Sequence, residues 1–210
     1  GTHVGGTRAI PLLIAREIID QAVEITRTAQ NGVLRVVPMM KPKVGVLITG
    51  NEVYHGRIED KFEPIIRKKV TALDGEVLDV VFLPDDDEKI AESARSLIDR
   101  GADILITTGG MSVDPDDRTR FALKKAGGVE MVYGSSVLPG AMFMITYIND
   151  KPVLGIPACG IYAPTTIFDL VYPRVLAGEK ITRQTLAKLG HGGLCLNCGT
   201  CAYPICPFGK

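Results

Sequence analysis

Short apolar runs alternate with amphipathic stretches along the middle of the chain. Lys43–Thr49 (KVGVLIT) and Glu76–Leu83 (EVLDVVFL) are rich in β-branched and aliphatic residues, a pattern typical of strands buried on both faces. Four further segments are predicted to be strands: residues 103–107, 129–133, 142–148 and 152–156. Asn149-Asp150 is predicted to form the turn between the last two.

Segments with apolar residues at helical spacing lie between these strands. The spacing predicts helices over residues 60–73, 85–100, 117–126 and 161–176. The acidic run Asp85–Asp87 suits the first turn of its helix, where the helix dipole is positive. Strands that alternate with helices predict an α/β fold, with a doubly wound, mainly parallel sheet and helices on both faces.

Two appendages flank this predicted domain of residues 43–177. Residues 1–42 are expected to form an N-terminal helix, over residues 10–30, and a connecting strand. Residues 178–210 form a glycine-rich and cysteine-rich tail. Because the chain starts at Gly1 rather than Met, we expect it to be processed or to be a piece of a longer protein.

Composition narrows the range of partners. Lys plus Arg (24) equal Asp plus Glu (24), so the net charge is zero, which disfavours nucleic acids and anionic membranes as partners. No apolar run reaches the ~18 residues of a membrane span, and no signal-peptide pattern opens the chain. Four of the five cysteines lie in the last sixteen residues, unlike a secreted disulfide framework. We therefore predict a cytoplasmic protein.

Ligands of doubly wound sheets bind at the carboxyl ends of the strands. Thr107-Thr108-Gly109-Gly110-Met111-Ser112 occupies such a position, and its glycines and hydroxyls could hold an anion, although a tight turn after the strand also needs glycines. Neither the P-loop pattern nor G-x-G-x-x-G is present, which disfavours a generic ATPase or a Rossmann dehydrogenase.

Carboxylates follow this loop and open an earlier helix. Asp114, Asp116 and Asp117 come soon after the glycines, and Asp60 precedes the helix of residues 60–73. Such groups can hold Mg²⁺ or accept hydrogen bonds from a heterocycle, or they can cap helices.

Five motifs in order resemble one known family. They are Thr49-Gly50-Asn51-Glu52-Val53, then Gly56-x-Ile58-x-Asp60, then Thr108-Gly109-Gly110-Met111-Ser112-Val113-x-x-x-Asp117, then Leu138-Pro139-Gly140, and then Gly155-Ile156-Pro157. Together they resemble the molybdopterin-binding domain shared by molybdopterin adenylyltransferases and molybdotransferases. The likeness is greater to the molybdotransferases and their stand-alone relatives.

The resemblance implies a pocket for molybdopterin at the sheet edge. Asp60 and Asp117 would serve catalysis or Mg²⁺. The residues implied to bind the cofactor are Thr49, Gly50, Asn51, Glu52, Thr108, Gly109, Gly110, Met111, Ser112, Pro139, Gly140 and Pro157. Homo-oligomers, trimers or larger, are also implied by the resemblance.

Several positions depart from the family pattern. Asn51 replaces an Asp, Asp114 replaces a Gly, and Ala158-Cys159-Gly160 stands where the family has Gly-Asn-Pro. The Lys that commonly follows Pro-Gly is absent, because Ala141 and Met142 stand there. These departures favour binding over catalysis. Cys159 would contact the cofactor or act as a small buried apolar residue.

The tail contains Cys195-x-x-Cys198-x-x-Cys201-x₄-Cys206-Pro207. Four thiols so close in sequence can surround one metal with little added loop-closure cost. The spacing resembles the bacterial ferredoxin run for an iron–sulfur cluster; zinc, free thiols and disulfides are the alternatives.

These observations predict a protein that binds molybdopterin or its molybdenum form. It would act in molybdenum cofactor synthesis, metal insertion or delivery to a molybdenum or tungsten enzyme. Two alternatives are a non-catalytic binding or redox-sensing module and a nucleotide pyrophosphatase-like hydrolase on the same domain.

Overall fold

The computed structural model describes residues 3–6, 8–29, 32–110 and 118–210. Two compact units make up the chain, residues 1–38 and residues 39–210. The first unit contains α1 (Arg16–Thr28), which is shorter than the predicted helix. No side-chain cap stands at Ala15, so no cap residue marks the first residue of this helix in the sequence.

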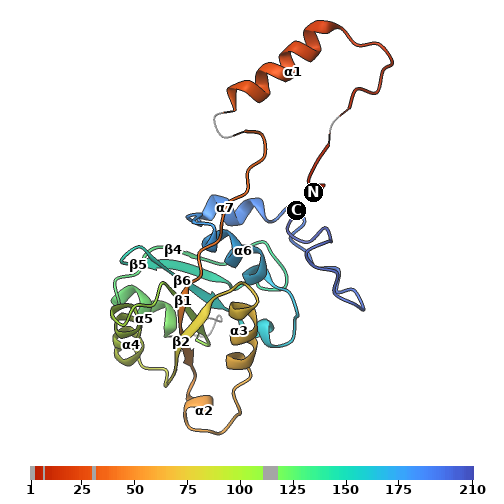
Figure 1. The fold of residues 1–210 in the computed structure, drawn as a ribbon. Coiled ribbons are helices and arrows are strands. Elements are labelled where there is room, and N and C mark those ends of the chain that lie inside the picture. The colour runs from red at the N-terminus through yellow and green to blue at the C-terminus, as the bar shows by residue number, and fades with distance from the viewer. Residues whose placement is uncertain (1–2, 7, 30–31, 111–117) are drawn as a thin grey trace. The chain divides into compact units, whose positions relative to one another are not determined.

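A six-stranded sheet forms the centre of the second unit, in the order β2-β1-β3-β6-β5-β4 (Figure 1). β1, β2, β3 and β6 are parallel, and β5 runs antiparallel to both of its neighbours. The bounds are β1 (Lys43–Thr49), β2 (Glu76–Leu83), β3 (Ile104–Thr108), β4 (Val129–Tyr133), β5 (Met144–Ile148) and β6 (Lys151–Ile156). The predicted α/β fold with a mainly parallel sheet is confirmed.

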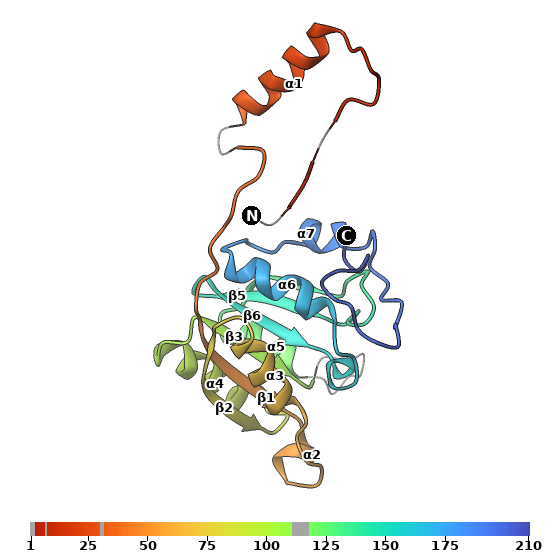
Figure 2. The same ribbon diagram turned by 45° about the vertical axis from the view of Figure 1, so that its right-hand side comes forward.

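Helices cover both faces of the sheet (Figures 1 and 2). α3 (Phe62–Thr71) and α6 (Ile167–Leu176) bury Ile66 and Phe168 on one face. α4 (Asp87–Asp99) and α5 (Thr119–Lys125) bury apolar residues such as Leu97 and Leu123 on the other. The remaining helices are short: α2 (Asn51–Tyr54), the 3₁₀ turn η1 (Ala158–Ile161) and α7 (Arg183–Lys188). Within the described ranges, no helix is long and apolar enough to cross a membrane.

The parallel register brings several strand ends to one edge. Ile48 of β1 pairs with Thr108 of β3, and Thr108 in turn pairs with Ile156 of β6. Leu83, the last residue of β2, pairs with Thr49. The segments that follow these four strands therefore leave the sheet side by side.

The prediction of a helix over residues 161–176 was too long. The chain first makes the turn η1, and α6 begins only at Ile167. A capping box starts α6, because the Thr166 hydroxyl accepts the Phe168 N–H (3.2 Å) and the Asp169 carboxylate accepts the Thr166 N–H (2.7 Å). The capping box therefore sets the start of α6 at Ile167, although apolar residues at helical spacing continue toward the N-terminus.

Tyr172 carries an unusual buried polar group on α6. Its side chain is 1% exposed, and its ring stacks on Phe168 with centroids 4.9 Å apart. The phenolic oxygen has no hydrogen-bond partner among the described residues. Burial alone raises the pKa of this phenol far above its usual value.

We expect Tyr172→Phe to be as stable as the wild type or up to about 1 kcal/mol more stable at pH 7, because it removes a buried hydroxyl without a partner. The raised pKa also predicts pH dependence. The neutral phenol contributes fully below about pH 10, where the unfolded chain begins to ionise. Above that pH, the wild type should lose up to about 1.4 kcal/mol per pH unit from this group, until the pH passes the folded pKa.

Denaturant unfolding of both proteins between pH 7 and 11 tests this expectation. Subtracting one curve of unfolding free energy against pH from the other removes the contributions of the lysines and the other tyrosines and leaves that of Tyr172. Parallel curves across the alkaline range would contradict the assignment.

Candidate functional site

A network of threonine hydroxyls joins the ends of β1, β3 and α5. Thr49 donates its hydroxyl to the Thr108 carbonyl (2.9 Å). The Thr119 hydroxyl lies 3.0 Å from that of Thr49 and 3.1 Å from the Gly109 carbonyl. Both hydroxyls are buried, so their three contacts are shielded from water. The two hydroxyls supply two protons to these three contacts. The network holds the exit of β3 against the end of β1.

The two glycines after β3 are required by this network. Gly109 has φ +80°, and a Cβ there would lie 2.1 Å from the Thr49 carbonyl oxygen. Gly110 has φ +53°, and a Cβ there would lie 2.4 Å from the Thr119 hydroxyl oxygen. Close packing and left-handed backbone therefore explain both glycines without any ligand.

A cavity of about 600 Å³ lies next to this turn, and we call it the strand-end cavity. Its walls come from the ends of β3 and β6, the loop between β4 and β5, the start of α3, and the tail. The lining residues are Phe62, Gly109, Gly110, Leu138, Pro139, Gly140, Ala141, Met142, Pro157, Ala158, Cys159, Leu194 and Cys195. The walls are mostly apolar, with backbone groups supplied by the glycines.

Five of the predicted binding residues line this cavity: Gly109, Gly110, Pro139, Gly140 and Pro157. Thr49 and Thr108 lie behind it, in the hydroxyl network. Met111, Ser112 and Asp117 lie outside the described residues.

Asn51 and Glu52 lie in α2 and are exposed, after Gly50 at its N-cap. Asn51 pairs reciprocally with Asp85: its N–H donates to the Asp85 carboxylate (3.1 Å), and its side-chain oxygen accepts the Asp85 N–H (3.3 Å). Asn51 thus ties the α2 turn to the end of β2. Neither Asn51 nor Glu52 lines the strand-end cavity.

Asp60 caps α3. One carboxylate oxygen accepts the Phe62 N–H (3.0 Å), and the other accepts the Glu63 N–H (2.7 Å). Phe62, which these bonds position, lines the cavity, whereas Asp60 does not. Asp86 makes a similar pair of bonds at the start of α4, away from the cavity.

Phe62 and Leu194 also line the cavity and had no clear signal in the sequence, whereas Leu138 belongs to one of the motifs that carry the resemblance. Phe62, Leu138 and Leu194 come from three distant segments, and only the fold brings them together. Cys159 lies in the wall half-buried, and burial raises the pKa of its thiol. The thiol is therefore neutral near pH 7, as expected of a small apolar residue.

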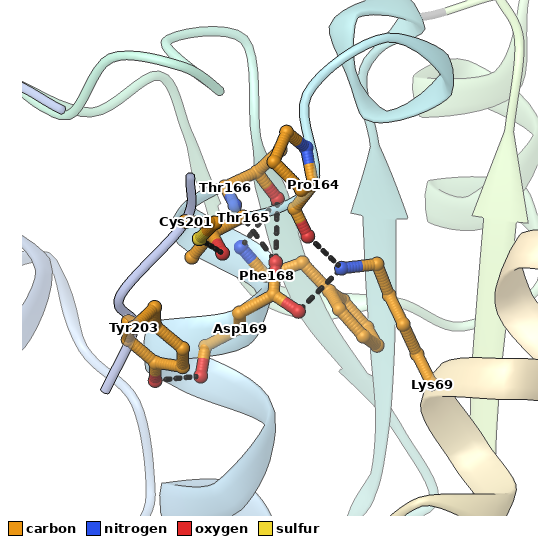
Figure 3. Close-up of polar contacts among 8 residues, drawn as sticks. All are labelled: Lys69, Pro164, Thr165, Thr166, Phe168, Asp169, Cys201 and Tyr203. Atoms are coloured by element: carbon orange, nitrogen blue, oxygen red, sulfur yellow. Dashed lines mark hydrogen bonds and ion pairs between the residues drawn. The ribbon is translucent and has the colours of Figure 1, made fainter. Parts of the chain in front are cut away.

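The tail packs on α6. Pro173 lies inside this helix and has no N–H, so the Asp169 carbonyl lacks its helical donor. The Tyr203 hydroxyl donates to that carbonyl instead (2.8 Å), and the Cys201 thiol lies 3.4 Å from the Thr165 hydroxyl (Figure 3). The Asp169 carboxylate also pairs with Lys69 of α3.

The cysteines of the tail are free thiols. Cys195 and Cys206 are half-buried, and Cys198 and Cys201 are exposed. In the part of the chain that the structure describes, no three His, Cys, Asp or Glu side chains form a group that could hold a metal ion.

Comparison with known proteins identifies relatives. A family model described as "Probable molybdopterin binding domain" matches residues 45–177. The molybdopterin molybdenumtransferase of Haemophilus influenzae is 29% identical over 177 residues, which cover 78% of this chain and 43% of that protein. A CinA-like protein of Thermosipho melanesiensis is 36% identical over 92 residues, 44% of this chain and 23% of that protein. The chain thus spans less than half the length of these curated relatives.

Solved structures share the fold. The molybdopterin biosynthesis enzyme MoaB of Thermus thermophilus superposes with a TM-score of 0.55 at 20% identity, covering 66% of this chain and 98% of that one. The molybdopterin biosynthesis MoeA protein of Pyrococcus horikosii gives a TM-score of 0.52 at 26% identity, covering 66% of this chain and 35% of that one.

The hydroxyl network predicts a specific effect of Thr119→Val. This near-isosteric change should lower the free energy of unfolding by about 1–3 kcal/mol, because a buried carbonyl and hydroxyl lose their partner. Thr146→Val is the matched control, since Thr146 is also buried and donates to the Val129 carbonyl (2.8 Å) but does not line the cavity.

Both variants should lose stability, but only Thr119→Val should speed amide exchange in the Gly109-Gly110 turn. Hydrogen exchange read by mass spectrometry distinguishes the two. Equal exchange of this turn in both variants would show that the network does not hold it.

Proposed function

The chain belongs to the molybdopterin-binding domain family, and from this premise we propose that it binds molybdopterin in the strand-end cavity and serves molybdenum cofactor biosynthesis. The observation that carries the proposal is the cavity itself. Most of its lining residues belong to the matched domain, and it lies at the carboxyl ends of β3 and β6, where ligands of doubly wound sheets bind. Its volume of about 600 Å³ falls in the usual range for small-molecule sites.

The walls of the cavity suit the parts of this ligand. The flat pterin would lie against Phe62, Pro139 and Pro157, which offer apolar surface. The phosphate would take backbone N–H groups at Gly109, Gly110 and the Met111-Ser112 segment that follows. Successive residues of a strand point to opposite faces of the sheet. Thr108 therefore lies on the same face as Ile104 and Ile106, which is the face covered by α3. Its buried hydroxyl has no hydrogen-bond partner among the described residues.

Asp60 would act by positioning Phe62 rather than by touching the ligand. Both of its oxygens already accept N–H groups of α3. Of the two carboxylates predicted to serve catalysis, Asp117, which follows the glycine turn in sequence, is the one left for contact with the ligand. We place no Mg²⁺ in this proposal, because no Asp or Glu is present among the described residues that line the strand-end cavity.

Binding and turnover can be separated in one series. Purified protein is mixed anaerobically with molybdopterin, and molybdate or Mg-ATP is then supplied while products are followed. Failure to bind molybdopterin would refute the proposal. Binding without turnover, unchanged in Asp117→Ala, would identify a binding module. A nucleotide bound more tightly than molybdopterin, and cleaved, would favour the hydrolase.

We expect Ala158→Phe to weaken molybdopterin binding at least tenfold, which corresponds to about 1.4 kcal/mol. Ala158 is exposed and lines the cavity, so a phenyl ring would fill the site without disturbing the core. Stability should change by less than about 0.5 kcal/mol.

Ala187→Phe provides the matched control, because Ala187 is also exposed but lies on α7 outside the cavity. Affinities follow from titrations of pterin fluorescence. If both variants bind like the wild type, the ligand does not occupy the strand-end cavity.

A second pair of variants tests the positioning role of Asp60. Asp60→Ala and Asp86→Ala each remove a carboxylate that accepts two helix N–H groups, and each should cost about 1 kcal/mol of stability. Only Asp60→Ala should weaken molybdopterin binding, since only α3 presents a side chain, Phe62, to the cavity. Equal affinity for molybdopterin in the two variants, at a temperature where both are folded, would show that Asp60 does not position the binding site.

A further inference from the structure

The four tail cysteines line one small cavity, separate from the strand-end cavity. This tail cavity has a volume of about 60 Å³, and its other walls include Pro139, Thr165, Tyr203 and Phe208. We infer that Cys195, Cys198, Cys201 and Cys206 bind one thiolate-seeking metal centre there, a zinc ion or an iron–sulfur cluster. We further infer that this centre fixes the wall shared with the strand-end cavity.

Backbone bonds hold the first cysteine in place. The Leu138 N–H donates to the Gly193 carbonyl (2.7 Å), and the Cys195 N–H donates to the Leu138 carbonyl (2.8 Å). Cys195 is therefore attached to the loop between β4 and β5, like one more short strand.

The far end of the tail is anchored independently. Phe208 is 3% exposed in the core beside α6, and the Gly209 N–H donates to the Gly192 carbonyl (2.7 Å). Between the two ends, Tyr203 is bonded to the Asp169 carbonyl (Figure 3). Protein contacts thus form the cavity and place the four cysteines along its walls. In the described residues no three of their thiols yet form a group that could hold a metal ion.

The chemistry of four thiols favours a soft metal. Thiolates select zinc or iron–sulfur clusters over hard cations such as Mg²⁺. Cys198 and Cys201 are exposed, so their side chains would have to turn into the cavity as the metal enters. Because the segment is already folded back on α6, little additional loop closure is needed. Binding would release the thiol protons, so affinity should rise with pH.

Three residues line both cavities: Pro139, Leu194 and Cys195. A metal bound through Cys195 would therefore hold one wall of the strand-end cavity, and its loss would free that wall. This coupling rests on the proposed function, whereas the metal site does not.

The metal site is tested on the full chain, purified anaerobically, reduced and freed of metal. One arm receives Zn²⁺ alone, and the other receives Fe²⁺ with sulfide. We expect one of the two to give a single centre per chain by metal and sulfide analysis, with visible absorption only for a cluster. Alkylation should then fall at Cys198 and Cys201 and stay unchanged at Cys159.

Single substitutions sharpen the result. Cys198→Ser and Cys201→Ser change exposed thiols, so they should fold normally and lose metal affinity more than about tenfold. Cys159→Ser, the matched control outside the tail, should keep it. Three outcomes would refute the metal site. They are the absence of a metal centre in both arms, full metal affinity in both tail variants, and disulfides among the four tail cysteines that persist under reduction.

The coupling is read from molybdopterin affinity with and without the bound metal. We expect weaker binding after the metal is removed, and the same weakening in Cys201→Ser. Equal affinity in both forms would refute the coupling and leave the proposed function intact. If neither form binds molybdopterin, the proposed function fails while the metal measurements still stand.

Discussion

The hydrogen bonds of the Thr49 and Thr119 hydroxyls are the contacts on which the site depends. They connect β1, the exit of β3 and the start of α5 at a point from which water is excluded. The backbones approach so closely there that only glycine fits at positions 109 and 110. The strand-end cavity opens directly beside this turn, so its floor is set by protein contacts and would not have to form on ligand binding.

A proline inside α6 creates the contact that holds the tail in place. Pro173 leaves the Asp169 carbonyl without a helical donor, and a buried carbonyl without a partner is costly. Tyr203 supplies the missing donor from a segment 34 residues away. The same aspartate starts α6 through its carboxylate and pairs with Lys69. One residue thus links helix capping, helix packing and docking of the tail.

The sequence predicted the elements whose signals are local. β1, β2 and β4 have the predicted bounds, and Asn149-Asp150 forms the predicted turn with positive φ at both residues. The start of α6 was missed because the Thr166–Asp169 capping box was overlooked beside a longer apolar spacing. In the cavity, Gly109 and Pro157 followed from strand ends and Pro139 from the family resemblance, whereas the contributions of Phe62 and Leu194 depend on long-range packing that no local pattern encodes.

The Asn51–Asp85 pair explains one departure from the family pattern in physical terms. An Asp at position 51 would bring a second carboxylate beside Asp85, and the two like charges would repel at the edge of the sheet. Asn51 offers the same acceptor oxygen without the charge. The strand-end cavity, which Asn51 does not line, has apolar walls and backbone donors, with no Asp or Glu among its described lining residues. Such a lining suits an anionic, planar ligand, and it is the reason for proposing that this cavity is a binding site.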